Sequence, residues 1–455
     1  MRRDFTRPCR SSGRILFGLG AAVLLSGCNS EILKVEDPDI IVEANSAAGA
    51  LALKNGVILR LTQATNGIQG PDALFIYSGL LADEWKSGDT FVQRNDMDQR
   101  LFDPNNTFLA GPFRSLNRVR VEGRAAVDAL RTYSPTPLSN IGLMFAVTAY
   151  AHNLAGEIYC NGVPVSFLEG QNIRFGEPLA VDSVFGLAIA AADSALANLT
   201  GVDSARVRQL ASVVKGRALL NRNRYTEAAA AVTNVATTFR YEVTHSLFST
   251  ENQTWLLNND ARRYTIADRE GLNGLPFVSA NDPRVPRRIA AATDLTFDTF
   301  EPVVRQGIWG RTSSVAIATG IEARLVEAEA ALRDNVPVTW LRILNDTLRA
   351  NTALYPPVQT GFTRPAPPLP AMTDPGTLAA RVDSLFYERA FWMFGSGHRL
   401  GDLRRLIRQF NRPRESVFPT GAWFKGGTYG AAVNIPVSIA EQNNPNFVEC
   451  TDRNP

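Results

Sequence analysis

The sequence predicts a mostly helical protein, in which pairs of α-helices form a superhelical scaffold and a loop-rich lobe is inserted between them. Apolar residues recur at helical spacing in most of the chain between residues 45 and 406. Two long stretches, 238–315 and 355–376, lack this spacing, and the second contains seven prolines. Proline prevents a helix from continuing, so we expect these stretches to be irregular. Loops of this length within a folded domain are usually functional or disordered.

The N-terminal segment, residues 1–27, is typical of a lipoprotein signal peptide. Five arginines precede the apolar run 15–25, which is too short to span a bilayer. The tetrapeptide 25–28, Leu-Ser-Gly-Cys, follows this run and is typical of a lipobox. We therefore expect cleavage before Cys28, attachment of lipid to its sulfur, and a polar tether over residues 28–44.

The charge balance gives no support for a nucleic-acid partner. The formal net charge of the whole chain is +3. The signal peptide alone carries +4, from five arginines and one aspartate, so its removal leaves a net charge of −1. A nearly neutral protein lacks the basic surface that nucleic-acid binding needs. The sequence contains no further apolar segment long enough to be transmembrane, and we expect residues 45–455 to form one domain.

The scaffold is predicted from the apolar faces of its helices. Taken in order, the predicted helices are 45–63, 112–131, 141–159, 182–199, 205–220, 225–235, 320–332, 341–348 and 377–394. Residues 205–235 form a helical hairpin similar to a tetratricopeptide unit, in which small residues let two helices pack closely. One hairpin cannot bury its own apolar face, so it needs the helices 320–332 and 341–348 as partners. We expect residues 67–103 to be irregular and to expose Trp85 in a loop.

The stretch 388–406 predicts two helices separated by a tight break. The triplet 395–397, Gly-Ser-Gly, ends the first helix, because glycine tolerates the left-handed backbone that a helix stop needs. Charged residues follow, and Asp402 and Arg405 are three residues apart, so they can pair on one helix face. An aromatic helix flanked by this much charge predicts a buried seam edged by ion pairs, with a structural role.

The same stretch resembles the C-terminal signature of the SusD/RagB family, outer-membrane nutrient-binding lipoproteins of polysaccharide-utilisation systems. The matching residues are Glu388, Arg389, Gly397, His398, Arg399, Asp402, Leu403, Arg404 and Arg405. The residues that depart from the signature are Ser396, Leu400 and Gly401. Other family elements occur in the family's order: the lipobox, the Gly-Val-Pro turn at 162–164, the hairpin, Asp282-Pro283-Arg284, the alanine–glutamate helix at 322–330, and Ile435-Pro436 with Asn444-Pro445-Asn446.

The resemblance implies a tetratricopeptide-like helical scaffold with a loop-rich ligand-binding lobe around 238–315 and 355–376. It also implies a protein held in the outer membrane by its lipid and exposed at the cell surface. Such a protein captures oligosaccharides and delivers them to a TonB-dependent, SusC-like transporter. Two alternatives remain open. One is capture of a peptide or another nutrient, and the other is a lipid-anchored helical scaffold without a small ligand.

The sequence lacks the motifs of common enzymes. A Gly-x-Ser-x-Gly elbow, a His-Glu-x-x-His pair and a phosphate-binding glycine loop are all absent. The chain has only three histidines, and neither these nor the cysteines have the paired spacing of a zinc site. We therefore expect a protein that is not an enzyme and that has no cofactor and no metal site.

The cysteines predict one disulfide. Cys9 leaves with the signal peptide and Cys28 takes the lipid, so Cys160 and Cys450 remain. Two remaining cysteines in an exported protein favour a bond between them, because exported proteins fold in an oxidising compartment. The alternative is two buried free thiols.

The expected glycan site combines exposed tryptophan rings with polar side chains, because sugars have apolar C–H faces and many hydroxyls. Trp340 and Trp392 lie in predicted helices and are assigned to the core, whereas Trp255 and Trp423 lie in irregular segments. The resemblance places ligand aromatics in an early loop and just before the alanine–glutamate helix. The predicted site residues are Trp85, Asp83, Asp89, Arg94, Asn95 and Trp309. A core position is the alternative for each tryptophan, since tryptophan is highly buried on average.

Overall fold

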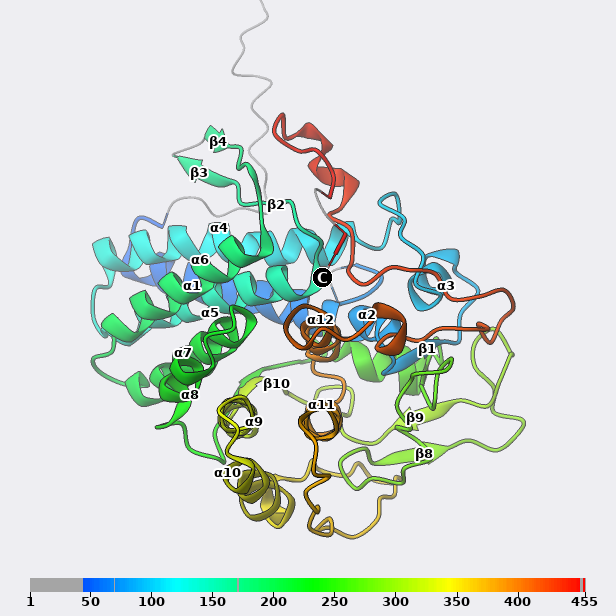
Figure 1. The fold of residues 1–455 in the computed structure, drawn as a ribbon. Coiled ribbons are helices and arrows are strands. Elements are labelled where there is room, and N and C mark those ends of the chain that lie inside the picture. The colour runs from blue at the N-terminus through cyan, green and yellow to red at the C-terminus, as the bar shows by residue number, and fades with distance from the viewer. Residues whose placement is uncertain (1–43, 69, 170–171, 451–452, 455) are drawn as a thin grey trace, which may run out of the picture. The chain divides into compact units, whose positions relative to one another are not determined.

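The computed structural model of the chain describes residues 44–68, 70–169, 172–450 and 453–454 (Figure 1). The predicted signal peptide 1–27 and the predicted lipidation site Cys28 lie outside these residues, as does the tether 28–44 except for Ala44. Across the described ranges, no helix is long and apolar enough to cross a membrane.

The first half of the described chain is an array of helices packed side by side (Figure 1). Its members are α1 (Ala47–Thr65), α4 (Ala110–Tyr133), α5 (Leu138–Ile158), α6 (Val181–Ala197), α7 (Ser204–Asn221) and α8 (Tyr225–Val232). In this order each helix packs against the next. The predicted mostly helical fold is confirmed, and the helix ends lie within a few residues of those expected from the apolar spacing.

The predicted helical hairpin is the pair α7 and α8. Its buried faces carry the apolar residues that the spacing indicated, among them Val207 and Leu210 on α7 and Ala228 on α8. A Cβ at Gly216 would lie 2.5 Å from Cγ1 of Val232, so glycine is needed for the two helices to approach this closely. The helix α9 (Gly320–Arg333) packs against both members and buries the face that the pair cannot cover alone.

The second half of the scaffold consists of α9 and the helices that follow it. The helix α10 (Pro337–Arg342) begins at a proline, which suits the first turn of a helix, and continues as the π-helical turn η2 (Ile343–Arg349). After the 3₁₀ turn η3 (Thr352–Leu354) and the proline-rich segment come α11 (Leu378–Trp392) and α12 (Arg399–Phe410). The helix α11 packs against α9, and α12 packs against α5.

Residues 67–103 are more ordered than the sequence predicts. They contain α2 (Leu74–Leu81), β1 (Trp85–Ser87) and α3 (Val92–Asp98). Every residue of α2 is buried, so this helix is apolar on all sides and has no polar face to reveal its period. The helix α3 is short and mostly polar. Both helices therefore escaped prediction from periodicity.

The strands of the described residues form five antiparallel pairs. They are β1 with β7 (Tyr264–Ile266), β2 (Val163–Pro164) with β5 (Pro178–Leu179), β3 (Phe167–Glu169) with β4 (Asn172–Arg174), β6 (Arg240–Val243) with β10 (Val315–Thr319), and β8 (Arg287–Ile289) with β9 (Val304–Gln306). The remaining short turns are η1 (Trp255–Asp260), η4 (Arg414–Ser416) and η5 (Ile439–Asn443). The region 238–315 is thus a set of short ribbons joined by loops, as expected for a loop-rich lobe.

The break between α11 and α12 has the left-handed backbone that the sequence predicts. The φ angle is +67° at Gly395 and +76° at Gly397. A Cβ on Gly397 would lie 2.3 Å from Cδ1 of Phe75 in α2, so a larger residue would clash as well as strain the backbone.

Buried ion pairs join the two helices at this break. Arg389 of α11 donates to both oxygens of Asp402 of α12, at 2.8 and 2.9 Å. Arg405 lies 3.4 Å from the same carboxylate and also pairs with Glu329 of α9. None of these four side chains is more than 5% exposed. The predicted buried seam edged by ion pairs is confirmed.

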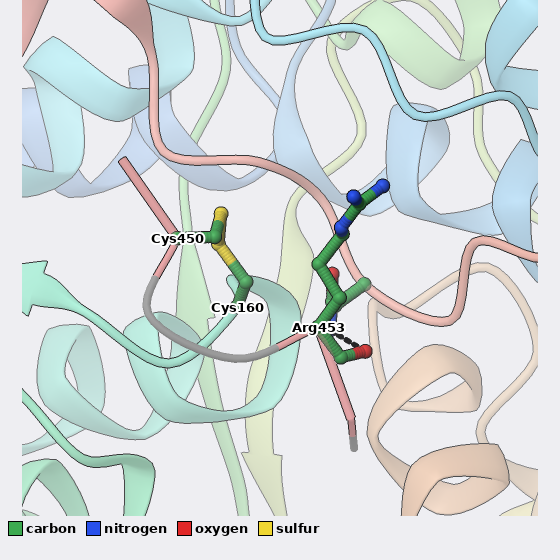
Figure 2. The surroundings of a disulfide bond; sticks show 4 residues. Cys160, Cys450 and Arg453 are labelled. Atoms are coloured by element: carbon green, nitrogen blue, oxygen red, sulfur yellow. Dashed lines mark hydrogen bonds between the residues drawn. A yellow bond between two sulfur atoms is a disulfide. The ribbon is translucent and has the colours of Figure 1, made fainter. Parts of the chain in front are cut away.

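Cys160 and Cys450 are bonded in the structure (Figure 2), as the cysteine count predicts. Cys160 follows the end of α5, Cys450 lies in the C-terminal tail, and their Cα atoms are 5.7 Å apart. The backbone N–H of Cys160 also donates to the carbonyl of Ile435 at 3.0 Å. The tail is thereby fixed to the scaffold at the place where α5 ends.

We predict that reduction of this disulfide lowers stability. The bond closes a loop of 290 residues, for which the chain-entropy model allows about 5 kcal/mol as an upper bound. Alkylation of the purified protein without reductant, followed by peptide mapping, should leave Cys160 and Cys450 unlabelled. Urea unfolding with and without reductant then measures the loss of free energy. Labelling of both cysteines before reduction would show that the bond does not form.

Candidate ligand-binding site

A cavity of about 450 Å³ lies between the loop-rich lobe and the C-terminal end of α11. Its wall comes from residues 237–242 and 308–321 around the β6–β10 ribbon, from 353–357, from 391–396, and from Arg284. The two predicted irregular regions therefore meet the scaffold here. The volume is within the range of small-molecule sites.

Aromatic rings form much of the wall. They belong to Phe239, Trp309, Tyr355, Phe391, Trp392 and Phe394. The ring of Trp392 is half-buried, and its centroid is 5.0 Å from that of Tyr355 at an interplanar angle of 59°. Trp309 is 7% exposed. These rings come from four separate segments of the chain, so the tertiary fold alone brings them together.

Hydrogen bonds to buried polar groups fix the two tryptophans. The side chain of Gln306, which is fully buried, accepts the backbone N–H of Trp309 at 2.9 Å and donates to its carbonyl at 2.9 Å. The Nε1 of Trp392 donates to Glu388 at 3.2 Å. These bonds hold the indole of Trp392 and the backbone of Trp309, whose ring is only 7% exposed and is held by packing.

Hydroxyl groups make up most of the polar lining. They belong to Thr237, Thr238, Ser313, Ser314, Thr319 and Ser396. Three of them, Thr237, Thr238 and Ser314, make no side-chain hydrogen bond to any other described residue. A hydroxyl both donates and accepts, so these three groups can bond to a ligand without breaking an existing contact.

The charges in the wall are already balanced by neighbouring side chains. In β6, Arg240 donates a hydrogen bond to the carboxylate of Glu242 at 2.8 Å. Arg284 is 1% exposed and donates to Asp282 and Glu388, with closest distances of 2.7 Å to each. The cavity therefore combines apolar rings, free hydroxyls and no uncompensated charge.

The structure brings one predicted site residue, Trp309, into this cavity. The prediction that Trp85 is exposed is wrong, because the side chain is fully buried in β1. Its ring packs 5.2 Å from that of Phe394, and a Cβ at Gly395 would lie 3.4 Å from its Cζ2 and 3.0 Å from the ring of Trp309. Trp85 thus lies beneath the cavity and offers no ring face to a ligand.

The four predicted polar residues also face the protein interior. Asp83 is fully buried and accepts two bonds from Arg399, at 2.6 and 2.8 Å. Asp89 and Arg94 are buried and paired with each other. Asn95 is half-buried and bonds to the carbonyl of Asp89 at 3.1 Å. None of the four lines the cavity. Their contacts stabilise the segment 67–103 within the protein.

The early segment contributes a different feature, which we call the phenylalanine surface and define as Phe91, Phe297 and Phe300. These rings are 46%, 42% and 55% exposed. The guanidinium of Arg263 lies between two of them, 5.1 Å from the centroid of Phe91 and 3.9 Å from that of Phe297. Two exposed rings beside one guanidinium, with a third exposed ring at Phe300, mark this surface as a second place where a ligand could stack.

Comparison with known proteins rests on structure alone. No family model matches the sequence, and no curated protein matches it. A SusD-like carbohydrate binding protein from Bacteroides fragilis is 13% identical, with a TM-score of 0.65 over 89% of this chain and 99% of that one. A SusD superfamily protein from Bacteroides thetaiotaomicron is 14% identical, with a TM-score of 0.62 over 90% of this chain and 100% of that one. A SusD-like carbohydrate binding protein from Bacteroides vulgatus is 12% identical, with a TM-score of 0.54 over 79% and 83%.

The chain has the SusD-like fold. The fold class and the resemblance inferred from the motifs are thereby confirmed. Identities this low carry no information about individual side chains, so the candidate site of this SusD-like chain rests on its own geometry.

Two residues of the candidate site were missed by sequence reasoning in this SusD-like chain. Trp392 was assigned to the core because it lies in a helix, but it occupies the last turn of α11, next to the break. Tyr355 opens the proline-rich segment and was not considered. Position in the chain could have pointed to both residues. Trp392 is the last residue of α11, and Tyr355 directly follows η3.

The side chain of Glu84 accepts a hydrogen bond from the backbone N–H of Gly395 at 2.8 Å and so stabilises the break between α11 and α12. Burial and the charge of Asp83 together raise the pKa of Glu84 to about 8, although that hydrogen bond and Arg399 lower it. Glu84 is therefore protonated at neutral pH in the folded protein and ionised in the unfolded chain.

We predict that this carboxyl makes the protein less stable as pH rises. Between the unfolded pKa of 4.5 and the folded pKa of about 8, the folded state binds the extra proton, so stability falls as pH increases through this window. The effect amounts to a few kcal/mol, on the order of 1.4 kcal/mol for each unit of pKa shift. Glu84→Gln should flatten the pH dependence of the free energy of unfolding between pH 5 and 8.

The matched control is Glu169→Gln in the exposed β3 strand, which should leave the pH dependence unchanged. Chemical denaturation at several pH values measures both variants. Equal slopes for Glu84→Gln and the unsubstituted protein would contradict a protonated Glu84.

Proposed function

We propose that this chain is a cell-surface lipoprotein that captures neutral oligosaccharides in the aromatic cavity and delivers them to a TonB-dependent outer-membrane transporter. The observation that carries the proposal is the composition of the cavity wall, in which fixed aromatic rings stand beside hydroxyl groups that have no other partner. A pyranose ring needs both, because its C–H face stacks on an aromatic ring while its hydroxyls exchange hydrogen bonds at the edge.

The charge balance of the wall favours a neutral glycan. Arg240 is paired with Glu242, and Arg284 is paired with two carboxylates, so no charge in the wall lacks a partner. A ligand with a free carboxylate or ammonium would be desolvated here without gaining an opposite charge. The same argument disfavours capture of a short peptide by its termini, which is the first alternative.

Two of the structurally similar proteins are described as carbohydrate binding, which supports the same class of ligand. The second alternative, a scaffold without a small ligand, gives no reason for a preformed cavity of this composition.

The anchor and the transporter are inferred from the sequence. The lipobox ending at Cys28 supports attachment to the outer membrane through lipid. The helical scaffold α1–α8 offers a surface for the transporter, because a stable complex buries at least about 1,000 Å² and an array of helix pairs is large enough. No residue of α1–α8 is among those that line the cavity, which lies where the lobe meets α11.

We predict that Trp309→Ala weakens glycan binding by about 1–3 kcal/mol, on the scale measured for rings that stack on nucleobases. Calorimetry with a panel of neutral oligosaccharides measures the affinity of the unsubstituted protein and of the variant. Trp309 also packs on the core, so Thr238→Trp is the second variant. Thr238 is exposed at the rim, and an indole there should fill the cavity and abolish binding while leaving the melting temperature unchanged.

The matched control is Trp255→Ala, because Trp255 is half-buried in η1 and does not line the cavity. Phe91→Ala tests the phenylalanine surface. Full affinity in Thr238→Trp together with loss of affinity in Phe91→Ala would move the glycan site to that surface. Binding of peptides in place of glycans would favour capture of a peptide. If neither glycans nor peptides bind, the result favours a helical scaffold without a small ligand.

We predict that the protein purified from native membranes carries a diacylglycerol on an N-terminal Cys28 and is accompanied by a large β-barrel transporter. Intact-mass analysis tests the lipid, and identification of co-purified proteins tests the partner. Cys28→Ala should release the protein from the membrane fraction. Recovery of that variant in the membrane at the unsubstituted level would contradict the anchor, and absence of a co-purified barrel would contradict the transporter complex.

A further inference from the structure

A second cavity, of about 310 Å³, lies apart from the aromatic one, beside the C-terminal tail. Its wall includes three arginines, Arg100, Arg414 and Arg453, and the side chains of Leu101, Phe102 and Asn434. The described residues of the wall include no aspartate or glutamate. The arginines come from the residues after α3, from η4 and from the tail, so three distant segments bring positive charge to one place.

Arg100 is the buried member of this group. Its side chain is fully buried, its Nε donates to the carbonyl of Ala432 at 3.0 Å and its Nη1 donates to that of Pro419 at 2.5 Å. Its Nη2 is buried and has no hydrogen-bond partner in the described part of the chain. The nearest carboxylate, that of Glu415, is 3.7 Å away and 59% exposed. A buried guanidinium with so weak a counter-charge is costly.

The pKa of Arg100 expresses that cost. Burial and the positive charge of Arg414 together lower the pKa of Arg100 to about 10, although Glu415 raises it. An anion in the cavity would remove the imbalance.

The other two arginines are held in place without a carboxylate partner in the described residues. Arg414 donates from Nη2 to the side-chain oxygen of Asn454 at 2.8 Å. The guanidinium of Arg453 lies 4.7 Å from the ring centroid of Phe102, and its backbone carbonyl accepts a bond from Asn434 at 2.8 Å. Figure 2 shows Arg453 beside the disulfide, three residues after Cys450. The bond thus fixes the tail that carries this arginine.

We propose that this cavity binds an oxyanion, the carboxylate, sulfate or phosphate group of a small ligand, between the guanidinium groups of Arg100, Arg414 and Arg453. Planar guanidinium groups match such anions because they donate two parallel hydrogen bonds to adjacent oxygens. The volume of the cavity exceeds that of a bare sulfate and admits a group the size of a monosaccharide. The oxyanion has two sources, a free inorganic ion or an acidic sugar. The proposal is independent of the glycan site, whose wall carries no uncompensated charge.

Calorimetry on the purified protein at constant ionic strength tests this site, with sodium chloride replaced in turn by sulfate, phosphate and glucuronate, and with glucose as the neutral probe. We expect at least one oxyanion to bind and to raise the melting temperature, while chloride and glucose do neither. Tighter binding of glucuronate than of sulfate and phosphate identifies an acidic sugar, and the reverse order identifies a free ion.

The variant Arg414→Gln/Arg453→Gln should weaken oxyanion binding at least tenfold. Its matched control, Arg131→Gln/Arg208→Gln, removes the same charge from exposed arginines on α4 and α7 that do not line the cavity, and should bind as the unsubstituted protein does. Ala431→Asp places a carboxylate at an exposed position of the wall and should abolish binding with the fold retained. Absence of binding for all three oxyanions, or equal affinity in the first variant and its control, would overturn the proposal.

Discussion

The buried ion pairs around the break between α11 and α12 hold together segments that lie far apart in the sequence. Arg399 of α12 reaches Asp83 near the N-terminal helices, and Glu388 of α11 receives Arg284 from the lobe. Each charge is buried, so removal of one partner would leave the other uncompensated at a cost of about 3–5 kcal/mol. Because a guanidinium pairs with a carboxylate only in a narrow range of orientations, these contacts fix where the lobe sits on the scaffold.

The candidate ligand site depends on the same arrangement. Trp392 is held by Glu388, the residue that also receives Arg284 of the lobe. Gly395 is held by Glu84, and a Cβ at this position would lie within 3.4 Å of the rings of both Trp309 and Trp85. The aromatic wall is therefore an extension of the core, and its geometry is set when the core packs. A ligand in this cavity would meet rings that are already packed in place, which lowers the entropy cost of binding.

Local signals explain which parts of this protein could be predicted from the sequence. Apolar spacing located the scaffold helices, and the glycines of the triplet 395–397 located the break, because both signals act over a few residues. The candidate site has no such signal. Trp85 lies in a segment without helical period, yet Phe394, far along the chain, covers it. Trp392 lies in a helix, yet the cavity opens beside it. Contacts between distant segments decide whether a side chain is exposed, and these contacts cannot be predicted from local patterns in a single sequence.

The bond between Cys160 and Cys450 turns most of the chain into a covalent ring. The ring includes the exposed proline-rich segment 355–376 and the loops of the lobe, which are the places that a protease would reach first. A single cut within the ring would leave two fragments that remain joined through sulfur. The buried ion pairs cross the same interval, so the nicked protein would keep its contacts as well as its connectivity. The arrangement therefore tolerates proteolytic nicking of the loops around the candidate site.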